Sequence, residues 1–280
     1  MLGKLLKYEF KSTSRVLWFL YAGLIVVALL FGIVLRVEFN LGDILFTGTA
    51  VEGGLDTNIF MTILMSALGI IYMLLIYAIF ITTTVVIVMR FYKNMLGGEG
   101  YLMHTLPVKT SNLILSKLIT AFCWMLIAGA VVVISTIVLG LSSGFITALL
   151  KNVDFREIMR GLNYIFSQIG MSGWTFMLLI LISTISTIVL YYLSMAIGNI
   201  ANNHKFLFSV LAYVGIQIVF SIILTAFSVV MGRTGYLLGT SYDMSWFSNY
   251  IWTMTGIQVV LGVGGFFLTN YLLSKKLNLA

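Results

Sequence analysis

The chain has 280 residues, of which 60% are hydrophobic and 9% are charged, and its net charge is +7. Soluble domains carry about a quarter charged residues, so this composition excludes a water-soluble monomer. The apolar runs are long enough for helical spans and lack the alternation typical of an outer-membrane barrel. We therefore expect an all-α integral membrane fold, with residues 1–280 forming a single transmembrane domain.

Residues 1–15 predict an amphipathic helix at the start of the chain. Four basic residues recur there at spacings of three and four, which places them on one helical face: Lys4, Lys7, Lys11 and Arg15. Such a face suits anionic lipid headgroups on the cytoplasmic side. The alternative is that these charges only flank the first span. The apolar run that follows is too long for a signal peptide and lacks a small-residue cleavage site, so we interpret it as a retained span.

Six apolar segments can cross a membrane: residues 16–35, 59–89, 113–141, 174–197, 206–230 and 250–273. As a helix rising 1.5 Å per residue, the second segment is roughly 46 Å long. The hydrocarbon core is about 30 Å thick. We therefore expect the second helix to tilt or to project into water.

The basic residues predict the orientation of the chain. With the N-terminus inside, the inner segments hold 11 of the 16 basic residues and the outer segments hold 5. Cytoplasmic loops carry this excess, so we expect a multi-pass protein of a cell membrane, most simply a bacterial plasma membrane, with both termini cytoplasmic. The net charge then reflects topology. Nucleic-acid binding would need a basic patch on a folded aqueous surface, and we expect no nucleic-acid partner.

Residues 153–169 predict a second amphipathic helix, on the extracellular side. Apolar residues from Phe155 to Ile169 keep a spacing of three and four, and polar residues occupy the other side. Asp154 followed by Glu157 resembles a capping box. This helix either lines a substrate exit or closes the helical bundle, and the sequence favours neither.

The chain lacks the motifs of an enzyme. No phosphate-binding G-x-x-x-x-G-K-[ST] loop is present, and the two histidines, His104 and His204, have no acidic or cysteine neighbours. We therefore expect no catalytic residues, no bound cofactor or metal, and no ATPase activity in this chain. No ionisable residue lies near the centre of a span, where ion-coupled carriers need one. The energy for any transport would have to come from another protein.

Several uncharged polar residues lie within the spans. Four of them are candidates for a substrate path: Gln217, Thr83, Ser183 and Thr187. The alternative is that the hydroxyl groups bond to their own backbone and assist helix packing. Gln217 is the stronger candidate because an amide needs a partner in hydrocarbon.

The segment 97–107 is the most unusual polar break in the chain. Gly97, Gly98 and Gly100 interrupt the second helix, and Pro107, the only proline, disfavours helix at the residue before it. Between them we expect a short helix whose apolar side chains would be a liability in water but an anchor in the groove of a partner.

The sequence of this break resembles that of a known family. Residues 99–108 are E-G-Y-L-M-H-T-L-P-V, and Ser116 and Lys117 open the third span. The stretch resembles the segment between spans two and three in permease subunits of ATP-binding cassette (ABC) transporters of the ABC-two exporter type. The resemblance also covers the N-terminal helix, the six-span layout and the chain length.

The resemblance implies that the segment is a coupling helix, which docks on a separate ATPase subunit and transmits ATP-driven movement. Its contact residues would be Glu99, Tyr101, Leu102, Met103, His104 and Leu106. The implied partners are two ATPase subunits and a second permease, identical or homologous. The chain departs from the family in one respect. Relatives of the sterol and drug exporter type carry their large outer loop between spans five and six, whereas here the longer outer segment is 142–173 and the segment 231–249 is short.

We therefore expect the permease half of an ATP-driven exporter, whose uncharged spans suit an amphipathic peptide, lipid or hydrophobic drug. The alternatives are a non-transporting assembly or sensor subunit and an ion-coupled secondary carrier.

Overall fold

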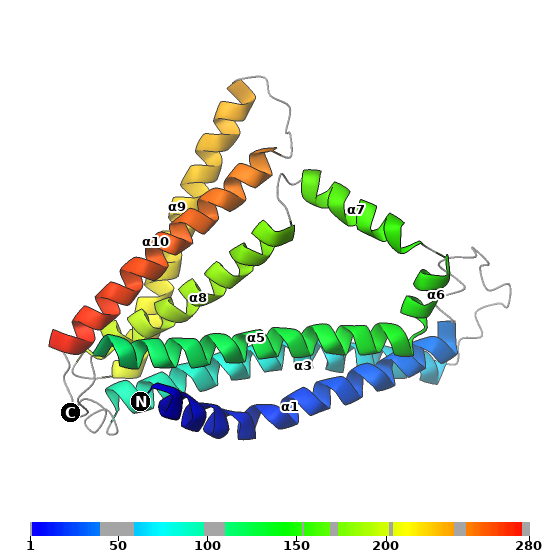
Figure 1. The fold of residues 1–280 in the computed structure, drawn as a ribbon, viewed down its shortest axis with the longest axis horizontal. Coiled ribbons are helices and arrows are strands. Elements are labelled where there is room, and N and C mark those ends of the chain that lie inside the picture. The colour runs from blue at the N-terminus through cyan, green and yellow to red at the C-terminus, as the bar shows by residue number, and fades with distance from the viewer. Residues whose placement is uncertain are drawn as a thin grey trace. The chain divides into compact units, whose positions relative to one another are not determined.

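The computed structural model describes residues 2–39, 59–97, 110–152, 154–168, 173–201, 204–237 and 245–275. Within these ranges the regular structure is helical (Figure 1). The elements are α1 (Leu2–Phe39), α3 (Ile59–Phe91), the π-helix η1 (Tyr92–Leu96), α5 (Thr110–Ser142), α6 (Phe145–Asn152), α7 (Phe155–Gln168), α8 (Gly173–Gly198), α9 (Lys205–Leu237) and α10 (Ser245–Lys275). The predicted all-α fold is confirmed for the described residues.

Six of these helices are long and apolar enough to cross a membrane, as the sequence predicts. The candidate spans are Leu17–Val37, Ile59–Leu96, Thr110–Ser142, Gly173–Gly198, Lys205–Val230 and Ser248–Ser274. Several helices extend beyond the predicted limits. The second reaches Leu96 through η1, and α9 continues to Leu237. Hydrophobicity marks the part of a helix that suits lipid, whereas backbone hydrogen bonding can continue past it.

The basic N-terminal segment and the first span form one continuous helix, α1. No glycine or proline separates Arg15 from Leu17, so nothing in the backbone ends the helix between them. The ribbon of α1 bends after its first turns (Figure 1). That the first turns lie along the membrane stays a prediction.

The chain forms two compact units, which we describe separately. The α1 unit comprises residues 3–86 and 123–160, and the α8 unit comprises residues 1–2, 87–122 and 161–280. In the α1 unit, the helices α1, α3 and α5 share one apolar core. Its buried members are Leu17, Tyr21, Leu24, Ala28, Tyr72, Ile79, Trp124 and Ala128. The α1 members recur every three or four residues, so one face of α1 supplies them all.

The Tyr72 hydroxyl in this core bonds to hydroxyl groups of α5, whereas the Tyr21 hydroxyl and Trp124 Nε1 are buried without a hydrogen-bond partner among the described residues. The Tyr72 hydroxyl lies 3.1 Å from Ser135 Oγ and 3.2 Å from Thr136 Oγ1.

Gly32 permits close approach of α1 to α5, because a Cβ atom there would lie 2.8 Å from the Leu139 carbonyl oxygen. Small residues let helix backbones approach in this way.

In the α8 unit, α8 packs against both α9 and α10. Gly198 lies so close to Ser209 that an added Cβ atom would overlap the backbone of Ser209. Gly262 brings α10 against α8 in the same way, since a Cβ atom there would lie 2.7 Å from Ser186 Oγ. Small residues therefore set the spacing of α8 from both neighbours.

Burial changes along α8. Trp174, in its first turn, is 79% exposed, and the large side chains that follow it, such as Met177 and Leu178, are also exposed. From Ser186 onward most residues are buried, and Tyr192 is 2% exposed. Among the described residues, the C-terminal half of α8 is therefore packed within protein, and its N-terminal half is exposed.

The predicted amphipathic helix at 153–169 corresponds to α7. Its first turn has the expected N-cap, because Asp154 Oδ1 accepts a hydrogen bond of 3.2 Å from the Arg156 backbone N–H. The last predicted residue, Ile169, lies outside the described residues.

Candidate functional site

The predicted contact loop lies outside the described residues, which end at Gly97 and resume at Thr110. Its six predicted contact residues, Glu99, Tyr101, Leu102, Met103, His104 and Leu106, are therefore not described. The two segments that flank the loop are described, and both belong to the α8 unit. They form the candidate site.

The first flank is the end of α3 with η1. Met95 and Leu96 in η1 are buried, and the Gly97 N–H donates to the Tyr92 carbonyl oxygen at 2.8 Å. A Cβ atom at Gly97 would lie 2.9 Å from the Lys93 carbonyl oxygen, so the close turn favours glycine. Single-turn π-helices are rare and occur frequently at functional sites.

An aromatic stack joins this flank to α8. The rings of Phe91 and Tyr192 lie 3.9 Å apart between centroids and only 8° from parallel. Phe91 is fully buried, and Tyr192 lies in the buried half of α8. Aromatic pairs of this kind contribute about 0.5–1.5 kcal/mol beyond the burial of their area. The end of α3 is thus fixed directly to α8.

The second flank is the first turns of α5. Leu113 and Ile114 are buried there, and Ser116 Oγ donates to the Leu113 carbonyl oxygen at 2.7 Å. Lys117 is only 6% exposed, and the residue has interaction partners. Both flanks of the loop are therefore part of a packed core.

The burial of Lys117 is a feature that sequence reasoning missed. Lys117 is one of the 11 inner basic residues that predict the orientation of the chain, and such charges are ordinarily solvated. Its position between Ser116 and Thr120 could have indicated burial. All three residues belong to the same pair of helical turns, and Thr120 is buried. A buried lysine near a span end is a functional candidate by default.

Three of the four predicted substrate-path residues, Gln217, Ser183 and Thr187, lie in the α8 unit, and Thr83 lies in the α1 unit. Gln217 Nε2 donates to the Tyr213 hydroxyl at 3.0 Å, and the Tyr213 ring lies 5.0 Å from that of Tyr191 on α8. One N–H of the Gln217 amide is therefore bonded within α9, to a tyrosine whose ring contacts α8. This arrangement favours helix packing over exposure to a substrate.

The hydroxyl candidates also bond locally. Ser183 Oγ donates to the Ile180 carbonyl oxygen at 2.9 Å, and Thr187 Oγ1 donates to the Ser183 carbonyl oxygen at 2.8 Å. Thr83 belongs to the α1 unit, where it is fully buried beside the Tyr21 hydroxyl without a well-formed hydrogen bond. Backbone bonding is the usual fate of hydroxyl groups in apolar helices.

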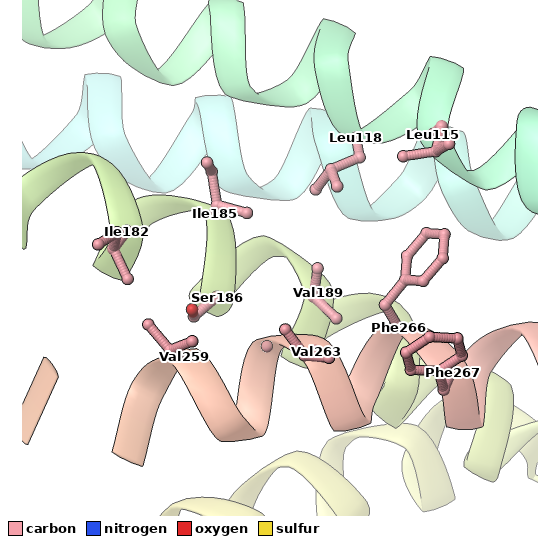
Figure 2. Close-up of a pocket in the computed structure, with 11 residues that line it drawn as sticks. Leu115, Leu118, Ile182, Ile185, Ser186, Val189, Val259, Val263, Phe266 and Phe267 are labelled. Carbon is pink, nitrogen blue, oxygen red and sulfur yellow. The ribbon is translucent and has the colours of Figure 1, made fainter. Parts of the chain in front are cut away.

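Two apolar hollows lie within the α8 unit. The first has a volume of about 290 Å³ and is lined by α5, α8 and α10 (Figure 2). Its only polar side chain is Ser186, which lies opposite Val259 in Figure 2. The second, of about 520 Å³, is lined by apolar residues and glycines of α8, α9 and α10. Neither hollow includes any of the four predicted substrate-path residues.

The described fold defines the chain as a multi-pass α-helical membrane protein. Comparison with known proteins adds no relative, since no protein-family model, curated protein or solved structure matches the chain.

Proposed function

We propose that the chain is the permease subunit of an ATP-driven exporter of the ABC-two type. It supplies half of a translocation pathway and pairs with an identical or homologous permease. Two ATPase subunits on the cytoplasmic side bind the loop 97–107 of each permease. The protein resides in a cell membrane with both termini in the cytoplasm.

The observation that carries this proposal is the construction of the flanks of the loop. A loop that transmits movement must be attached to elements that move with it. Phe91 and the η1 residues bury one flank, and Leu113 and Ile114 bury the other. The stack on Tyr192 then passes any displacement to α8, which packs against α9 and α10. A loop that only connected two spans would need no such attachment.

The apolar hollows support an amphipathic or apolar substrate. They offer one hydroxyl group and no charge to a ligand. Pockets of this composition take ligands whose affinity comes from apolar contact. A lipid, a hydrophobic peptide or a hydrophobic drug fits this chemistry better than a sugar or an ion.

The docking assignment is tested by co-purification. The chain is purified in mild detergent from its source membranes, and bound ATPase is identified by mass spectrometry and nucleotide hydrolysis. We expect the triple change Tyr101→Ala, Leu102→Ala, Leu106→Ala to abolish ATPase binding. The matched control replaces three exposed apolar residues of α9, Phe206, Leu207 and Leu211, with alanine. Retained ATPase binding in the loop variant would overturn the assignment.

Transport in sealed vesicles separates this proposal from its alternatives. ATP-dependent substrate movement that survives an uncoupler supports the exporter. Loss of movement on adding an uncoupler at constant ATP would indicate an ion-coupled carrier. ATPase binding without movement of any amphipathic probe would indicate an assembly or sensor subunit.

A further inference from the structure

The helix α7 has an apolar face that no described part of the protein covers. Taking about 100° per residue, six apolar side chains fall within an arc of roughly 120°. They are Phe155, Ile158, Met159, Leu162, Ile165 and Phe166. The opposite arc holds Arg156, Arg160, Asn163 and Ser167. This division is the signature of a helix that meets two different environments at once.

The exposure of α7 shows that its apolar face is not packed on described protein. None of its residues is buried, and Met159 and Leu162 are each 42% exposed. A Cβ atom added at Gly161 would meet no atom within 4 Å. An exposed apolar stripe of this size is unfavourable in water, so something else covers it.

The position of α7 along the chain indicates what covers it. The helix lies between two candidate membrane spans, α5 and α8, and its last residue precedes the start of α8 by five Cα steps. An extended chain covers at most roughly 18 Å in that number of steps. A direct contact also joins the two helices. The ring of Phe166 lies 6.2 Å, between centroids, from the ring of Phe176 in the first turns of α8.

The first turns of α8 carry the features of a membrane interface. Trp174 is the most exposed tryptophan with a described side chain in the α8 unit, and tryptophan concentrates at the level of lipid headgroups. The C-terminal half of α7 contacts these turns through Phe166. Its exposed apolar side chains therefore adjoin the exposed apolar side chains of α8.

We propose that α7 lies in the membrane interface, with its apolar face against the acyl boundary and its polar face toward water. The partner is the lipid surface itself. Arg156 and Arg160 lie on the polar arc, from which long basic side chains reach phosphate groups while their stems cover apolar surface. This proposal does not depend on ATP-driven transport.

Nitroxide scanning of α7 tests the proposal. The only cysteine, Cys123, is first replaced with serine, and single cysteines are then placed at Met159, Leu162, Arg160 and Ser167. Each variant is labelled and reconstituted in vesicles of phosphatidylcholine and phosphatidylglycerol. Collision with oxygen reports lipid, and collision with a water-soluble nickel chelate reports solvent.

We expect the ratio of oxygen to nickel accessibility to be several-fold higher at 159 and 162 than at 160 and 167. Nickel access at all four positions would place α7 in water and overturn the proposal. Protection of 159 and 162 from both reagents would show a protein contact, such as a second copy of the chain, and would also overturn it. Amide hydrogen exchange on the unlabelled protein provides a check without substitutions, because vesicles should protect residues 155–168 more than lipid-free detergent does.

Discussion

The two ends of α8 differ in what holds them. At the C-terminal end, Tyr192 stacks on Phe91, and Gly198 fits against Ser209. At the N-terminal end, Trp174 is exposed, and Phe176 contacts Phe166 of α7. Both ends are similarly apolar in sequence, so hydrophobicity alone does not distinguish them.

The same apolar composition therefore serves two purposes along α8. Large side chains at the buried end are matched to protein neighbours, and changing their shape leaves a cavity or a clash. Large side chains at the exposed end need only an apolar solvent, which lipid supplies. The effects of substitution should therefore fall steeply from one end of α8 to the other.

The largest expected effect is that of Phe91→Ala. The change removes a fully buried ring and its stack on Tyr192, and we expect a loss of about 3 kcal/mol in the free energy of unfolding. Denaturant titration of the purified protein in detergent measures it. The matched control is Phe206→Ala on α9, where the ring is 63% exposed. Equal losses in the two variants would show that Phe91 is not part of a packed core.

Gly198→Ala should have the next largest effect. The added methyl group would overlap the backbone of Ser209 and push α9 away from α8. We expect destabilisation of about 2 kcal/mol, as for other overpacked interiors, measured by the same titration. Gly215→Ala on α9 is the control, because its Cβ atom would meet nothing within 4 Å. A neutral Gly198 variant would mean that the two helices can separate at little cost.

On α7, which contacts the exposed end of α8, the change Asp154→Ala should act locally. It removes the N-cap of α7, and the expected cost is about 1 kcal/mol. Amide exchange across residues 155–168 should accelerate while the global unfolding midpoint stays unchanged. Asp154→Asn keeps a capping oxygen and should restore the slower exchange. A shift of the global midpoint would show that α7 is part of the folded core.

The smallest expected effect is a gain from Gly161→Ala. The site is open, and alanine stabilises a helix interior relative to glycine by about 0.5 kcal/mol. Exchange of the α7 amides should therefore slow slightly. Faster exchange would reveal a close contact at this position and would weaken the contrast between the two ends of α8.

The sequence was sufficient to predict the helical class and the six spans, because apolar runs of span length have few other interpretations. The sequence also predicted α7 and its Asp154 N-cap, because both depend on the spacing of residues that are close together in the chain. Contacts between distant segments were beyond it. Nothing in the residues around Phe91 indicates that its partner is Tyr192, and nothing around Gln217 separates a lining amide from one bonded to Tyr213.

Helix ends and the burial of Lys117 were also beyond the sequence. A hydropathy pattern marks only the part of a helix that suits lipid, whereas α9 continues to Leu237 through two glycines and an arginine. Lys117 was assigned by its charge alone, although packing decides whether a charge near a span end is solvated. The docking residues in 97–107 stay a prediction because they lie outside the described residues.

The fit of Gly198 against Ser209 has a consequence for how the protein is made. Only residues 199–204 separate α8 from α9, so the ribosome delivers the two helices in immediate succession. The contact of Gly198 with Ser209 joins the end of one helix to the start of the next. The two helices can therefore pack together, starting from the connection between them, while α10 is still being translated. The helix α10 then packs against a helical hairpin that has already formed.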